Sequence, residues 1–139
     1  MKPLTKNLVY FSIFFFIGAV VFRYCLSNCI ENRNTQLLWV IPLSYFVFNL
    51  FIGRHFGKRD YETLPFYDIA FRFHLATYII FNGVSVLWFF MHFNSHFEDI
   101  GAVLITAAYW GIGLLLHFIS YLVAGKRTIN GIDKADIFE

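Results

Sequence analysis

Two apolar stretches decide the fold: Tyr109-Trp110-Gly111-Ile112-Gly113-Leu114-Leu115-Leu116-His117-Phe118-Ile119-Ser120-Tyr121 and His74-Leu75-Ala76-Thr77-Tyr78-Ile79-Ile80-Phe81-Asn82. Each is apolar enough to lie in lipid, and each carries a histidine, although an uncompensated polar group in hydrocarbon is unfavourable. We therefore expect the two stretches to pack together and to shelter each other's polar atoms. Two further apolar runs precede this hairpin.

The composition is that of an integral membrane protein. The chain has 139 residues, of which 58% are hydrophobic and 14% are charged, with a mean hydropathy of +0.59. Soluble domains are about 25% charged, and a soluble fold of this length could not bury so much apolar surface in one core. The net charge of +2 is too small to indicate binding to nucleic acid. The lipid bilayer is therefore the first predicted partner.

Four apolar runs are long enough to cross a bilayer. They occupy about residues 8–27, 36–53, 69–93 and 100–124, and a helix of about 20 residues spans the hydrocarbon layer. The first run lacks a clear small-residue cleavage site and is interpreted as a retained span. The predicted fold class is all-α: a polytopic membrane protein whose four transmembrane helices form an antiparallel bundle.

These runs predict four parts. Residues 1–53 form an N-terminal transmembrane hairpin, residues 54–68 a basic cytoplasmic loop, residues 69–127 a second hairpin, and residues 128–139 a cytoplasmic tail. The link between the third and fourth spans is only a few residues long, so these two helices must be antiparallel neighbours.

The basic residues predict the orientation. Nine of the 11 lysines and arginines flank one side of the alternating spans: Lys2, Lys6, Arg54, Lys58, Arg59, Arg72, Lys126, Arg127 and Lys134. Only Arg23 and Arg33 fall on the other side, and the stem of Arg23 is expected to extend to the headgroups. By the positive-inside rule, both termini are predicted to be cytoplasmic.

Polar side chains follow one face of each of the last two spans. We call them the polar seam: His74, Tyr78, Asn82, Trp110 and His117, spaced three or four residues apart or a multiple of this on their helices. Tyr78 and Asn82 are expected at the depth of His117, so that one of them forms a hydrogen bond with its imidazole. His74 is expected nearer the cytoplasmic surface.

Small residues on the fourth span are predicted to let the helices approach closely. Ala107 and Gly111 form a small-xxx-small pair, and Gly113 lies one turn before His117. The polar seam then has two interpretations. In the favoured one its hydrogen bonds hold two helices in register; in the other it is a proton relay, a ligand site or a metal site. Haem ligation by His74 and His117 is disfavoured, because His117 is expected to lie deeper.

No catalytic or cofactor motif is evident. We find no nucleophile elbow, phosphate loop, metal cluster or paired carboxylates, and no acidic residue lies mid-span. We therefore expect no catalytic residues, no metal and no cofactor, and the protein is predicted not to be an enzyme. The missing intramembrane carboxylate also argues against a small proton-coupled exporter. Cys25 and Cys29, one turn apart, are interpreted as inert thiols in preference to a redox pair.

The second hairpin resembles the bacterial 2TM domain family. That family carries His-Leu-x-x-Tyr-x-x-x-Asn on its first helix and Trp-Gly-x-Gly-Leu-x-x-His on its second. The matching residues here are His74, Leu75, Tyr78, Asn82, Trp110, Gly111, Gly113, Leu114 and His117. The resemblance covers about residues 66–127 and leaves the N-terminal hairpin as an addition. It implies a multi-pass protein of the bacterial cytoplasmic (inner) membrane, of a type found alone or attached to signalling domains such as histidine kinases and LytTR-type regulators.

The expected function is that of a small non-enzymatic membrane protein, a signalling or partner-binding module. The basic loop and the tail are its expected cytoplasmic contact surfaces, and its partner is expected to be another membrane protein or a second copy of the chain. The alternative is a subunit of a small oligomeric channel or transporter whose path is lined by His74, Asn82 and His117.

Overall fold

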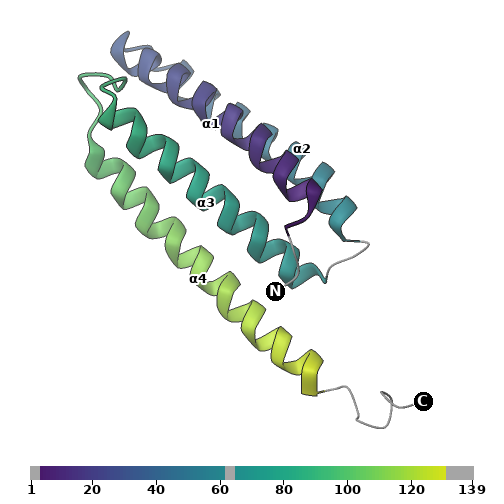
Figure 1. The fold of residues 1–139 in the computed structure, drawn as a ribbon. Coiled ribbons are helices and arrows are strands. Elements are labelled where there is room, and N and C mark those ends of the chain that lie inside the picture. Colours follow the sequence, from purple (N-terminus) through teal and green to yellow (C-terminus); the bar gives the residue numbers. More distant parts are fainter. Residues whose placement is uncertain (1–3, 62–64, 131–139) are drawn as a thin grey trace.

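The computed structural model describes residues 4–61 and 65–130, with side chains as far as residue 124. The helices in this part of the chain are α1 (Lys6–Glu31), α2 (Leu37–Asp60), α3 (Phe66–Phe90) and α4 (Ile100–Asn130) (Figure 1). Each contains a segment long and apolar enough to cross a membrane. The predicted fold class, an all-α protein with four spans, is therefore confirmed.

Local signals set where the helices begin and end. The Thr5 hydroxyl accepts a hydrogen bond from the Leu8 N–H and caps the start of α1. Asp68 places a negative charge in the first turn of α3, where it complements the helix dipole. Helices α1 and α3 end just before Arg33 and His92, whose φ angles of 52° and 59° turn the chain out of the helix.

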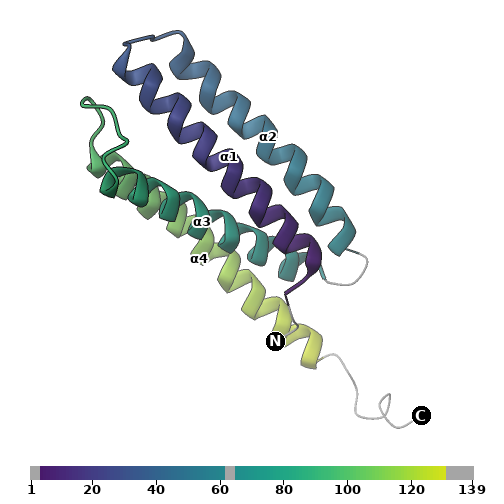
Figure 2. The same cartoon turned by 45° about the horizontal axis from the view of Figure 1, so that its top comes forward.

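The helices lie in the spatial order α2, α1, α3, α4 (Figure 1, Figure 2). Helix α1 packs against both α2 and α3, whereas α2 and α3 touch only weakly. Helix α4 packs against α3 alone among the described helices. Successive helices run antiparallel, so the structure consists of two hairpins joined mainly through α1 and α3.

One face of α1 forms the centre of the protein. Its buried residues follow each other at intervals of three or four: Leu8, Phe11, Phe15, Ala19, Arg23 and Ser27. The Phe11 ring contacts Phe73 of α3 with centroids 4.6 Å apart. The Phe15 ring contacts Tyr45 of α2 at 6.0 Å. This face of α1 therefore holds the two hairpins together.

Much of the remaining apolar surface faces outward. Trp39 is 83% exposed, Phe51 75% and Leu116 61%, and they represent a much larger set of exposed apolar side chains. Water would not tolerate so large an apolar surface, whereas the hydrocarbon of a bilayer would. The outer surface thus fits a protein solvated by lipid.

Two segments predicted as loop and tail are partly helical. Helix α2 continues past the predicted end of its span to Asp60, so only residues 61–65 separate it from α3. The buried Asp60 carboxylate accepts hydrogen bonds from Thr5 (2.5 Å) and Asn7 (2.7 Å), which ties the end of α2 to the start of α1. Helix α4 likewise extends to Asn130. Residues 131–139 of the predicted tail lie outside the described part.

Candidate functional site

The two histidines of the polar seam lie against each other. The rings of His74 on α3 and His117 on α4 have centroids 4.9 Å apart in an edge-to-face arrangement. The expected bond from His117 to Tyr78 or Asn82 is not formed, and His117 has no hydrogen-bond partner within the described chain. The expectation that His117 lies deeper than His74 was wrong. The predicted register places Tyr78 opposite His117, whereas in the structure Tyr78 lies beside Gly111, six residues earlier on α4, and His117 meets His74.

Tyr78 packs where the small residues of α4 leave room. Its hydroxyl lies 3.3 Å from the position that a Cβ on Gly111 would take, and a Cβ on Gly113 would lie 3.5 Å from the His74 ring. The Tyr78 and Trp110 rings meet at 6.4 Å between centroids. Ala107, one turn before Gly111, is half-buried. The glycines thus let the side chains of α3 approach the α4 backbone closely.

Two polar atoms of the seam are buried and unpaired. Asn82 donates its amide to the Tyr78 carbonyl of its own helix at 2.8 Å, but its Oδ1 has no partner within the described chain. The Nε2 of His74 is also buried and has no partner within the described chain. The His117 side chain, by contrast, is exposed. A buried polar atom without a partner costs about 1–3 kcal/mol. Both atoms can therefore gain from a further hydrogen bond.

The thiols and carboxylates form no cluster. Cys25 and Cys29 are both free, and the Cys29 thiol donates to the Asn34 carbonyl at 3.0 Å. Within residues 4–61 and 65–130, no three His, Cys, Asp or Glu side chains gather as a metal ion would need.

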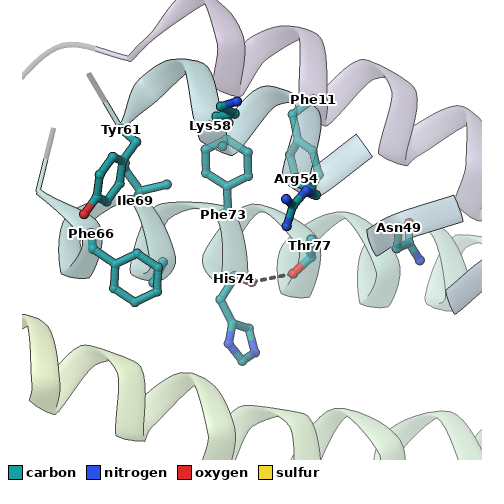
Figure 3. A pocket seen from close by; sticks show the side chains of 13 residues that line it. Phe11, Asn49, Arg54, Lys58, Tyr61, Phe66, Ile69, Phe73, His74 and Thr77 are labelled. Carbon is teal, nitrogen blue, oxygen red and sulfur yellow. Dashed lines mark hydrogen bonds between the residues drawn. The ribbon is translucent and has the colours of Figure 1, made fainter. Parts of the chain in front are cut away.

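A groove of about 700 Å³ lies between α2 and α3, which pack only weakly against each other (Figure 3). Its apolar part includes Phe11 and Ile69, both buried, and Phe73. His74 also lines the groove, and its ring projects from α3 toward α4, where the unpaired Nε2 is buried. The groove therefore touches both hairpins.

Two glycines of α2 keep the groove open. Gly53 and Gly57 are one turn apart, and a Cβ added at either would meet no atom within 4 Å. By contrast, a Cβ at Gly18 of α1 would approach the Phe48 ring to 2.5 Å, as expected where two helices pack closely. Side chains of the protein thus leave the space beside Gly53 and Gly57 unfilled.

The groove is basic. Arg54 and Lys58 line it from α2, and none of its described lining residues is Asp or Glu. Both side chains are exposed, and neither forms an ion pair or hydrogen bond with another residue of the described chain. Sequence reasoning assigned both to a loop and so missed the groove. The sequence feature that indicates the groove is the four-residue spacing of Gly53 with Gly57 and of Arg54 with Lys58, because residues four apart lie on one face of a helix.

A buried ion pair lies toward the opposite end of the helices. Arg23 of α1 and Glu98, in the segment between α3 and α4, are 2.6 Å apart, and each side chain is only 6% exposed. The expectation that Arg23 extends to the headgroups was therefore wrong. Its guanidinium turns into the protein because a carboxylate is available there.

The ion pair belongs to a polar stripe on α1 that we call the loop clasp: Arg23, Ser27 and Glu31, four residues apart. Ser27 accepts a hydrogen bond from the Trp88 indole at 3.0 Å. Glu31 accepts one from the Ser95 hydroxyl at 2.6 Å. The loop clasp thus fixes the end of α3 and the following loop to α1.

We compared the chain with protein-family models, with curated proteins and with solved structures. No match was found in any of the three comparisons. The groove, the polar seam and the loop clasp are accordingly the features from which a function can be inferred.

Proposed function

We propose that this protein is a non-enzymatic integral membrane module that binds a partner or a signal molecule in the groove between α2 and α3. The proposal depends chiefly on one observation: the groove is left unfilled by the protein's own side chains. A concave, mostly apolar surface with a few convergent polar groups is the usual form of a binding site. Because His74 lines the groove and also contacts His117 of α4, an occupant of the groove would affect the packing of α3 against α4.

The proposal includes the resemblance to the bacterial 2TM domain family, whose two sequence patterns lie on α3 and α4. Residues of the two sequence patterns meet there: His74 with Trp110 and His117, and Tyr78 with Gly111. The family is associated with signalling modules of the bacterial inner membrane, where we place this protein. The N-terminal hairpin contributes α2, which forms the other wall of the groove.

We further propose that both termini are cytoplasmic, on the basis of the basic residues. Truncation fusions to a compartment reporter at Tyr61 and at Glu139 should read cytoplasmic, because the positive-inside rule retains these ends. Fusions at Asn32 and Ser95 should read outside. A cytoplasmic signal at Asn32 would contradict this orientation.

Photo-crosslinking tests the binding role. Phe66 is 70% exposed and lines the groove, whereas Phe51 of α2 is 75% exposed and does not. With benzoylphenylalanine at either position, irradiated native membranes should give a discrete adduct from position 66. Position 51 should give only the diffuse labelling expected of a side chain in bulk lipid.

Filling the groove provides the matched control. Gly57→Leu places a side chain in the groove, and Gly83→Leu adds the same side chain at a glycine of α3 that faces open space outside the groove. The adduct from position 66 should be lost with Gly57→Leu and should persist with Gly83→Leu. Equal labelling at positions 66 and 51, or an adduct unaffected by Gly57→Leu, would contradict the binding role.

A further inference from the structure

We propose that the occupant of the groove is an anionic phospholipid, with its phosphate at Arg54 and Lys58 and an acyl chain along the apolar part of the groove. This inference rests on the binding role proposed above and adds the chemical class of the ligand.

The charges of the groove favour an anionic ligand. Arg54 and Lys58 face the groove from one helix without a counterion in the described chain. Lys58 lies in the last turn of α2, the depth at which a helix leaves the hydrocarbon and meets the headgroups. A guanidinium can bind phosphate through two parallel hydrogen bonds, and an ammonium adds a point charge. Anionic lipid is the phosphate source at this depth.

The apolar lining of the rest of the groove favours a hydrocarbon chain. Its lining runs from Tyr61, which directly follows α2, inward to Asn49 of α2, about 18 Å at 1.5 Å per residue. Along this path Phe66 and Phe73 present apolar surface that the protein does not bury and that an acyl chain would cover. A soluble anion would satisfy the two cations and leave this surface empty. A lipid satisfies both parts.

Lipid retention by the purified full-length protein tests this inference. In a neutral detergent, phosphatidylglycerol and phosphatidylcholine with the same acyl chains are offered together, and bound lipid is read by native mass spectrometry. The wild type should retain phosphatidylglycerol. Arg54→Gln with Lys58→Gln should lower its preference by roughly 30-fold, since each cation near lipid phosphate contributes about fivefold. The charge-retaining exchange Arg54→Lys with Lys58→Arg should keep most of the preference.

A matched pair of substitutions controls for net charge. Lys6 and Arg59 are exposed basic residues at the same end of the protein and do not line the groove. Lys6→Gln with Arg59→Gln should leave the preference for phosphatidylglycerol essentially unchanged. An equal loss in both double variants would overturn the inference, because the effect would then be one of overall charge.

Two further results would also overturn it: equal retention of both lipids by the wild type, and displacement of phosphatidylglycerol by inorganic phosphate at equal concentration. The second would identify a site for a soluble anion. If position 66 crosslinks to a protein and the purified chain shows no lipid preference, the lipid proposal is contradicted and the proposed binding role stands. If position 66 gives no discrete adduct, both the lipid proposal and the binding role are contradicted.

Discussion

Replacing Glu98 with alanine is expected to lower the free energy of unfolding by about 3–5 kcal/mol, because it leaves the Arg23 charge buried without a partner. The two side chains are 2.6 Å apart and each is 6% exposed. The guanidinium also lies over the Phe89 ring at 5.5 Å, but an aromatic face cannot replace a carboxylate beside a desolvated cation. Unfolding of the purified protein in mixed micelles, titrated with a denaturing detergent, measures the change.

Two companion variants show whether the loss comes from the stranded charge. Arg23→Met with Glu98→Met removes both charges and should recover most of the stability, since apolar replacement of a whole buried pair is often neutral. Arg59→Met removes an exposed cation and should stay within about 0.5 kcal/mol of wild type. If Glu98→Ala were as mild as Arg59→Met, the ion pair would not be buried as described.

The four spans could be predicted from hydropathy alone, because a run of about 20 apolar residues is a strong and local signal. The ends of the helices were harder to predict. Gly53 to Asp60 reads as a polar, basic segment, yet it continues α2. The Asp60 side chain is held there by Thr5 and Asn7, and no local sequence pattern indicates contacts that come from the start of the neighbouring helix.

The register of α3 and α4 shows how a small error at one end becomes a wrong contact. Helix α3 ends at Phe90, three residues before the predicted end at Phe93. In an antiparallel hairpin this moves the residue opposite His117 by about three positions toward the start of α3. That shift accounts for most of the four-residue difference between Tyr78, the predicted partner, and His74, the observed one. The residues of the seam could be predicted, but their pairing could not.

Contacts between the hairpins were beyond sequence reasoning. The Arg23–Glu98 bond joins residues 75 positions apart, and the groove depends on how α2 and α3 are placed relative to each other. A periodic pattern indicates which face of a helix is apolar. It does not indicate which neighbour covers that face, particularly in a bilayer, where lipid is an equally good apolar neighbour.

That ambiguity is largest for α1, which has phenylalanines on several sides, and it leads to the second prediction. Phe15 is 2% exposed and contacts Phe11 and Tyr45 at 5.7 Å and 6.0 Å between ring centroids. Phe16, the next residue, is 49% exposed. Phe15→Ala should lower the free energy of unfolding by about 2–3 kcal/mol, whereas Phe16→Ala should change it by less than about 0.5 kcal/mol.

The size of the Phe15 effect follows from what holds membrane helices together. Truncating a buried phenylalanine in a soluble core costs about 3–5 kcal/mol, of which part is transfer from water. In a bilayer the separated helices still face hydrocarbon, so that part is absent and the loss of packing contacts remains. The detergent titration used for Glu98→Ala gives both values. Equal costs for Phe15→Ala and Phe16→Ala would show that α1 does not present the Phe15 face to α2 and α3.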